Sequence, residues 1–212
     1  MRTALRPACA ALVLALAPSA CVGPVESTSD GGRPEARASV RAWHYEPDLP
    51  VSSPPFQEVH TNWKQRVDQP YVFLEFTGPY SETGRLLPVV HRTMREQGLE
   101  PAGAPFGLFF DDPGLVPAAE LRSRACVPVD RPVKTSGALR YEVLPSTTVV
   151  YAVAGGAYPE VPRCYPGLYA YMARMGWTES GPIRELYLIP PDAVDDFSEL
   201  RCEVQIPVRY GG

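Results

Sequence analysis

The chain has 212 residues, of which 45% are hydrophobic and 21% are charged, and its formal net charge is -4 at pH 7. A mildly acidic chain without a basic run lacks the charge pattern of nucleic-acid-binding proteins, so we expect no nucleic-acid partner. The length suits one domain with a sizeable core and additional sequence beside it.

Residues 1–21 have the pattern of an export signal. Arg2 and Arg6 precede an apolar stretch, residues 8–17, which is too short to span a bilayer. The stretch leads to Cys21 and resembles a bacterial lipoprotein signal, in which the cysteine is acylated and becomes the mature N-terminus. We therefore expect a lipid-anchored protein of the bacterial cell envelope that faces the periplasm or the exterior, with simple secretion as the alternative.

Residues 22–55 are rich in Pro, Gly, Ser and Asp, which predicts a flexible tether. Its two aromatic residues, Trp43 and Tyr45, either dock on the domain or stay exposed. The domain itself is expected over residues 56–212. Its three cysteines match no zinc pattern and allow at most one disulfide among them; they are Cys126, Cys164 and Cys202.

The domain contains an internal sequence repeat. Residues 63–113 match the sequence 78 positions further on at eleven places, against about four expected by chance. The repeated residues include Val72, Gly78, Tyr80, Glu82, Arg85, Pro88, Met94, Gly98, Gly103, Leu108 and Pro113. The repeat predicts two modules, 58–130 and 138–208, related by pseudo-twofold symmetry around a central cleft.

The sequence pattern predicts the same order of elements in each module: strand, helix, strand, strand. In the first module we expect strands at 71–76, 107–110 and 121–129. A helix between the first two has Pro88 in its first turn and ends at Gly98, the usual left-handed C-terminal residue.

The second module repeats these elements. It predicts strands at 147–154, 183–189 and 200–208, and a helix over 166–175 closed by Gly176. Strands of this kind with one helix per module define an α+β fold with antiparallel sheets.

Two features of these elements are interpreted further. The short runs 63–67 and 140–144 are expected to extend the first strand of their own module across a bulge at Pro70 or Pro145. The second helix has residues at helical spacing on one face, which predicts that this face packs in the core against the sheet. They are Tyr165, Leu168, Tyr169, Met172 and Met175.

The order of the motifs resembles the GyrI-like small-molecule-binding domain, which is also the effector-binding module of AraC-type and multidrug-responsive regulators. The motifs are Gly78-Pro79-Tyr80, Gly103-Ala104-Pro105, Phe109-Phe110-Asp111-Asp112-Pro113, Gly156-Ala157-Tyr158, Gly176-Trp177 and Glu185-Leu186-Tyr187. The resemblance implies an aromatic-lined cavity between two modules, bulky and often cationic amphipathic ligands, and a negative charge supplied by Glu185. An export signal and tether stand here in place of a DNA-binding part, so transcriptional regulation is not expected.

The two modules differ at the position that carries a carboxylate. Glu185 aligns with Gly107 and lies in an otherwise apolar strand. A carboxylate that faces a low-dielectric cavity is costly unless a cation completes the pair. Alternatively, Glu185 points to solvent or pairs with Arg184 or Arg201.

Aromatic residues are the candidates for the cavity wall: Tyr187, Trp177, Phe109 and Tyr151. Tyr80 and Tyr158 follow the repeated glycine turns. They either close a strand onto a helix or contribute to the pocket.

Non-enzymatic binding of an amphipathic, cationic or aromatic small molecule is the function that these features favour. No metal or cofactor motif is present in the sequence, and no nucleophile motif either. The alternatives are a small-molecule hydrolase that uses Glu185 and Tyr187, and a structural or protein-binding lipoprotein whose cleft has collapsed.

Overall fold

The computed structural model of the protein describes residues 47–211. The predictions on the export signal, Cys21, Trp43 and Tyr45 fall outside these residues. The described strands are β1 Asn62–Arg66, β2 Gln69–Thr77, β3 Phe106–Phe109, β4 Arg122–Pro128, β5 Arg140–Leu144, β6 Thr147–Gly155, β7 Trp177–Glu179, β8 Ile183–Tyr187 and β9 Arg201–Tyr210. The two α-helices are α1 Thr83–Glu96 and α2 Tyr165–Met175.

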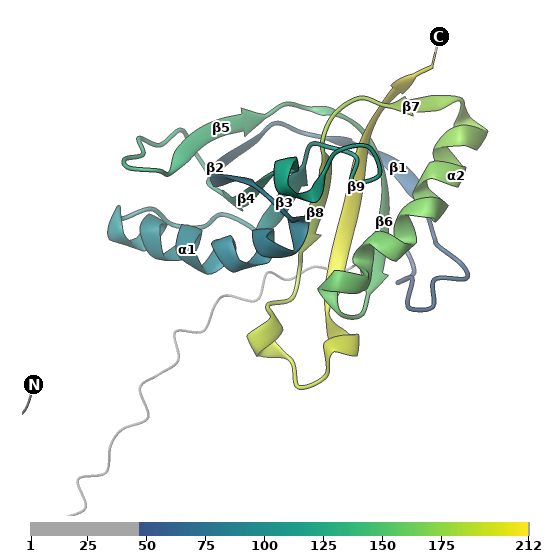
Figure 1. Ribbon diagram of the computed structural model, residues 1–212, viewed down its shortest axis with the longest axis horizontal. Coiled ribbons are helices and arrows are strands. Elements are labelled where there is room, and N and C mark those ends of the chain that lie inside the picture. Colours follow the sequence, from purple (N-terminus) through teal and green to yellow (C-terminus); the bar gives the residue numbers. More distant parts are fainter. Residues whose placement is uncertain (1–46, 212) are drawn as a thin grey trace, which may run out of the picture. The chain divides into compact units, whose positions relative to one another are not determined.

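The described strands form one antiparallel sheet whose order is itself symmetric. The order is β1-β6-β9-β8-β3-β4-β2-β5, and the short β7 pairs with β9. The sequence repeat relates the strands that stand at mirrored positions in this order: β1 to β5, β6 to β2, β9 to β4, and β8 to β3. In Figure 1 the two helices lie on either side of β8 and β9. The α+β fold with two pseudo-twofold-related modules is therefore confirmed.

Strands β1 and β5 are exchanged between the modules. β1 pairs with β6, where Trp63 lies opposite Val150, and β5 pairs with β2, where Tyr141 lies opposite Val72. The prediction that these runs extend the first strand of their own module is wrong. Each run instead covers an edge of the other module, whose backbone N–H and C=O groups would otherwise lack partners.

Helix α1 begins earlier than the sequence suggests. Pro88 lies inside the helix rather than in its first turn, and it cannot donate a backbone hydrogen bond to the carbonyl of Gly84. In module two a 3₁₀ helix, Tyr158–Cys164, occupies the equivalent turns, so Pro166 comes at the start of α2. The predicted C-terminal glycines are confirmed, because Gly98 and Gly176 have φ of 68° and 67°.

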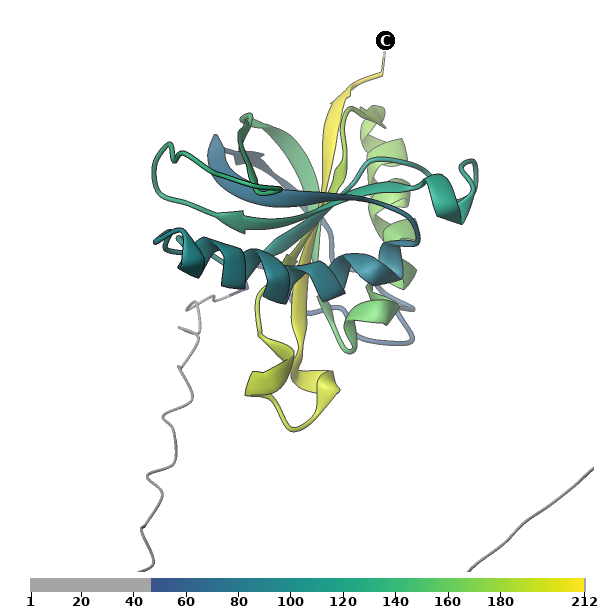
Figure 2. The ribbon, with the colours of Figure 1, turned by 60° about the vertical axis from the view of Figure 1, so that its left-hand side comes forward.

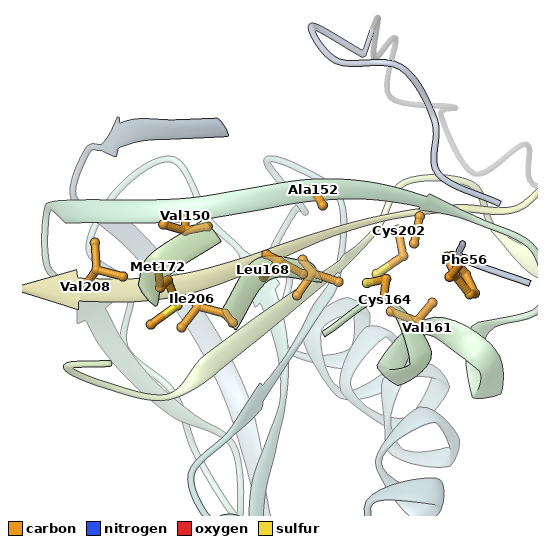
Figure 3. Close-up of a cluster of buried hydrophobic side chains, with 12 residues drawn as sticks. Phe56, Val150, Ala152, Val161, Cys164, Leu168, Met172, Cys202, Ile206 and Val208 are labelled. Carbon is orange, nitrogen blue, oxygen red and sulfur yellow. The ribbon is translucent and has the colours of Figure 1, made fainter. Parts of the chain in front are cut away.

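Each helix covers its own part of the sheet. α1 packs on β2 and β4, and Figure 2 shows it running along one face of these strands. α2 packs on β6, and its Leu168 and Met172 lie in one buried cluster with Val150 of β6 and Ile206 of β9 (Figure 3). Burying such side chains contributes roughly 1.5–3 kcal/mol each, so these contacts fix the helices on the sheet.

The opposite face of the sheet is also buried. Tyr71, Phe73, Phe106 and Leu108 form a separate buried cluster there. Cysteines contribute to both faces: Cys126 belongs to this cluster, while Cys202, and Cys164 at the N-terminal end of α2, belong to the cluster on the helix-bearing face (Figure 3). All three are free thiols and are buried.

The last residues of the predicted tether lie along the sheet. Ser52 forms a parallel bridge with Ala154, and its backbone N–H donates to the carbonyl of Val153 at 2.8 Å. Asp48 accepts a hydrogen bond from the Tyr151 hydroxyl at 2.8 Å. Residues that precede position 56 therefore already contact the domain.

Candidate functional site

A cleft of about 1840 Å³ opens on the helix-bearing face of the sheet. Its walls come from both modules: α1 and β3 on one side, and α2 and β8 on the other. Nine of the described residues that line it are prolines: Pro88, Pro101, Pro105, Pro113, Pro159, Pro162, Pro166, Pro190 and Pro191. Proline fixes its own φ angle, so the backbone at these positions has little freedom to lose when a ligand binds.

Glu185 lies at the floor of the cleft. Its side chain is only 5% exposed, and it accepts hydrogen bonds from two phenols. The Tyr165 hydroxyl donates to Oε1 at 2.5 Å, and the Tyr187 hydroxyl donates to Oε2 at 3.1 Å. Glu185 thus points neither to open solvent nor to Arg184 or Arg201, and no cation lies within 4.0 Å of it among the described residues.

Burial controls the protonation of this carboxyl group. Loss of hydration raises the pKa of Glu185 to about 7, although the two phenol hydrogen bonds oppose the rise. The same burial, together with the Glu185 charge, holds the pKa of Tyr165 and Tyr187 well above its ordinary value. The phenols therefore remain donors, and the carboxyl group titrates close to neutral pH.

The pseudo-twofold axis passes beside Glu185. In the pairing of β3 with β8, Glu185 lies directly opposite Gly107, the residue that it matches in the repeat. A Cβ atom at Gly107 would meet Phe109 Cζ at 2.8 Å and the Tyr187 hydroxyl at 3.1 Å. The missing side chain at Gly107 thus makes room for the rings around the carboxylate.

The polar groups at the floor come from module two alone. Tyr165 corresponds to Leu87 of module one, and Tyr187 corresponds to Phe109. All four line the cleft. The cleft therefore has one half with a carboxylate and two phenols, and one half that is apolar at the same positions.

Two ring pairs flank the axis symmetrically. Tyr80 lies 4.8 Å from Phe109, and Tyr158 lies 4.8 Å from Tyr187, measured between ring centroids. The Tyr80 hydroxyl donates to the carbonyl of Asp111 at 2.8 Å, and the Tyr158 hydroxyl donates to the equivalent carbonyl of Ile189. The two hydroxyls thus bond to the backbone and the two residues line the cleft, while their contact with a ligand stays a prediction.

Two of the seven residues that we predicted to bind the ligand lie outside the cleft. Trp177 stands beyond the end of α2, with its ring centroid 6.1 Å from that of Trp63. Tyr151 lies on β6 beneath Lys64, whose Nζ is 3.9 Å from the ring centroid. Neither lines the cleft. The remaining five, Glu185, Tyr187, Phe109, Tyr80 and Tyr158, all do.

Several cleft residues were missed from the sequence. Tyr165 and Tyr169 belong to the α2 stripe that we interpreted as core, but both line the cleft, and Met175 is 42% exposed. His91 of α1 also lines the cleft, and burial followed by the charge of Arg95 lowers its pKa. The signal that separates Tyr165 and Tyr169 from Leu168 and Met172 is their hydroxyl group, which prefers the edge of a core.

The described residues place limits on other chemistry. Within residues 47–211, no three His, Cys, Asp or Glu side chains are grouped so that they could hold a metal ion. Neither α1 nor α2 is long and apolar enough to cross a bilayer, and no other helix of that part of the chain is either.

The comparisons with known proteins agree with this geometry. Residues 63–209 match the GyrI-like small molecule binding domain, so the chain belongs to that family. A search of curated proteins gave no match.

Solved structures share the fold at low sequence identity. The EcmrR C-terminal domain superposes with a TM-score of 0.66 at 21% identity, over 72% of this chain and 99% of that one. EcmrR in a complex with DNA gives 0.65 at 20%, over 71% of this chain, which spans only 57% of that longer chain. A hydrolase from Listeria innocua gives 0.51 at 9%, over 70% of this chain and 91% of that one.

Proposed function

We propose that the cleft binds one bulky apolar cation, with Glu185 as its counter-ion. The observation that carries this proposal is a buried carboxylate that faces an open cleft and has no cationic partner among the described residues. Membership in a family of small-molecule-binding domains supports it.

Binding would follow from the electrostatics of the floor. A bound cation stabilises the ionised form of Glu185 and so lowers its pKa from about 7. Tyr165 and Tyr187 hold the two oxygens in place while the cation approaches. The ring pairs on both sides add cation–π attraction of about 0.5–2 kcal/mol per ring.

A matched pair of probes tests the charge. Tetraphenylphosphonium and tetraphenylborate have nearly the same shape and opposite charges. Calorimetric titration of the protein should show binding of the phosphonium at least tenfold tighter than binding of the borate. Glu185→Gln should weaken phosphonium binding at least tenfold and reduce this preference.

Glu179→Gln is the matched control, because Glu179 lines the cleft but is exposed and bonded to Tyr169. Solvent screens an exposed charge, so we expect less than a threefold change. Equal phosphonium affinity in the wild type and in Glu185→Gln would contradict the role of Glu185.

We further propose that the mature protein is held at a membrane of the bacterial envelope through Cys21. The support is the sequence of residues 1–21, which ends in a cysteine after a short apolar run. Labelling of cells with a radioactive fatty acid should mark the wild-type chain and not Cys21→Ser. An unlabelled wild-type chain released in soluble form would favour simple secretion.

Hydrolysis of a small molecule is a second candidate, favoured by one observation. A carboxyl group with a pKa of about 7 is suited to general acid–base work, and the Tyr187 hydroxyl lies 3.1 Å from it. A panel of epoxides and activated esters should then show turnover that Glu185→Gln abolishes. Absence of turnover across the panel, with intact phosphonium binding, would leave binding as the function.

No observation favours the third alternative, a structural or protein-binding lipoprotein whose cleft has collapsed. The cleft is open and Glu185 faces it.

A further inference from the structure

Two arginines are buried on the sheet face opposite the cleft. Successive strand residues point to opposite faces, so Arg184 lies behind the floor that carries Glu185. The Arg184 side chain is 4% exposed and Arg66, at the end of β1, is 8% exposed. The sheet separates these guanidinium groups from the cleft.

Neither guanidinium has a carboxylate within ion-pair distance among residues 47–211. Arg66 donates one hydrogen bond, from Nη2 to the carbonyl of Pro145 at 2.9 Å. Its Nε and Nη1, and the Nε of Arg184, are buried and meet no acceptor in the described part of the chain. A buried N–H group without an acceptor is unfavourable, and a buried guanidinium without a counter-charge is more so.

The carboxylates of this face already pair with other cations. Glu203 accepts from Lys64 Nζ at 2.8 Å and from the Gln205 side chain at 2.6 Å. Glu142 lies 2.5 Å from Arg124 Nη1. The negative charge of Glu203 also acts on Arg184 and raises the pKa of its guanidinium, so it offsets part of the positive charge on this face.

The two guanidinium groups also act on each other. Burial, and then the positive charge of Arg66, lower the pKa of Arg184 to about 10. The Arg184 guanidinium lies 4.0 Å from the centroid of the Phe106 ring. Stacking covers one face of the planar group, so its N–H bonds, which lie in the plane, are directed to a neighbour at its edge.

We propose that Arg66 and Arg184 together bind the oxygen atoms of a small oxyanion, of the phosphate or carboxylate class. Guanidinium groups match both kinds of oxyanion through paired N–H donors. One anion would supply acceptors for the unpartnered N–H groups and offset the positive charge that Arg66 and Arg184 place on this face. The site is independent of the proposed function, because it lies on the other side of the sheet.

Thermal unfolding and calorimetry of the mature protein test this site. Inorganic phosphate, and acetate in a second arm, are titrated against sodium chloride at constant ionic strength. We expect the melting temperature to rise and saturate with at least one of the two anions, with a single binding event in calorimetry. The arm that responds identifies phosphate or carboxylate as the preferred class.

Variants test whether Arg66 and Arg184 bind the anion that raises the melting temperature. Arg184→Met and Arg66→Met should lose it, and Arg184→Lys, which keeps the charge but not the planar fork, should weaken binding at least tenfold. Arg140→Met is the control, because Arg140 is exposed on β5 and contacts only backbone carbonyls; it should respond as the wild type does. Glu185→Gln should also leave the response unchanged.

Two results would overturn the proposal. One is a wild-type protein whose stability follows ionic strength alone and that gives no saturable heat with either anion. The other is an equal anion response in Arg184→Met, which would place the binding elsewhere. Both measurements on the wild type remain decisive if a variant fails to fold.

Discussion

Glu185 is the residue in which stability and the proposed function oppose each other. Burial makes its ionised form costly, and the two phenol hydrogen bonds recover only part of that cost. A side chain chosen for stability alone would be neutral, as Gly107 is in the other module. This cost is the reason why we propose a cation as the ligand that completes the pair.

The free energy of unfolding should therefore depend on pH through Glu185. Its folded pKa of about 7 lies above the value of 4.5 expected for a free glutamate, so the folded state binds the proton more tightly. This contribution to stability is fully present below about pH 4.5 and is lost as the pH rises through 7. Relative to wild type, Glu185→Gln should gain about 3 kcal/mol between pH 4.5 and pH 8, measured by urea unfolding.

Glu58→Gln serves as the control for that measurement, since the Glu58 side chain is 80% exposed. A stability difference between wild type and Glu185→Gln that stays constant over this pH range would show that the burial of the carboxyl group is not what controls its titration.

Gly107 should tolerate no side chain without loss of ligand binding. In Gly107→Ala the new methyl group would stand 2.8 Å from Phe109 and 3.1 Å from the Tyr187 hydroxyl, so both rings must move. We expect phosphonium affinity to fall at least tenfold with a loss of stability of about 1–3 kcal/mol. Unchanged affinity in a folded Gly107→Ala protein would mean that the ring positions at the floor do not matter.

The residues of the floor were only partly predictable. Glu185 stood out because the repeat supplied a neutral counterpart, Gly107. Tyr165 did not, because the core stripe and the cleft wall of a helix have the same spacing in sequence. Trp177 was misplaced because it begins β7, beyond the end of the helix that borders the cleft.

At the scale of elements, local sequence signals were sufficient to predict where a helix lies. They were not sufficient to predict which distant strands pair. The second helix was predicted over 166–175 and is found over Tyr165–Met175, since periodicity and a C-terminal glycine act within a few residues. The pairing of β1 with β6 joins residues more than 80 positions apart. Nothing in the sequence of 63–67 specifies which module's edge it covers.

The ends of the helices offer a matched pair of glycine substitutions. Gly176 has φ of 67° with nothing near its Cβ position, so Gly176→Ala places alanine in a left-handed conformation and should cost about 1 kcal/mol. Gly84 lies within α1, and its Cβ position is equally open. Gly84→Ala should instead stabilise by about 0.5–1 kcal/mol in urea unfolding. Changes of the same sign at both positions would contradict this account of the backbone.

At the scale of the whole described unit, the exchange of β1 and β5 ties the modules together. Each module completes the sheet of the other, so neither has a full set of strand partners alone. The cleft between them is therefore built on one continuous sheet, and its floor, at β3 and β8, lies where the two halves meet.

Such a structure should unfold as one cooperative unit. Urea transitions followed by far-ultraviolet circular dichroism and by tryptophan fluorescence should coincide, because Trp63 and Trp177 belong to strands of the shared sheet. Two separate transitions would indicate modules that are stable independently of the exchanged strands.

The pH dependence of cation binding tests the central role of Glu185 most directly. Tetraphenylphosphonium affinity, measured by calorimetry from pH 5.5 to 8.5, should be nearly constant above pH 8. Below the Glu185 pKa of about 7 it should fall by about tenfold per pH unit, because the cation must displace a proton. Glu185→Gln should bind weakly at every pH. A wild-type affinity that does not change with pH, or a slope that persists in Glu185→Gln, would contradict a buried glutamate as the counter-ion.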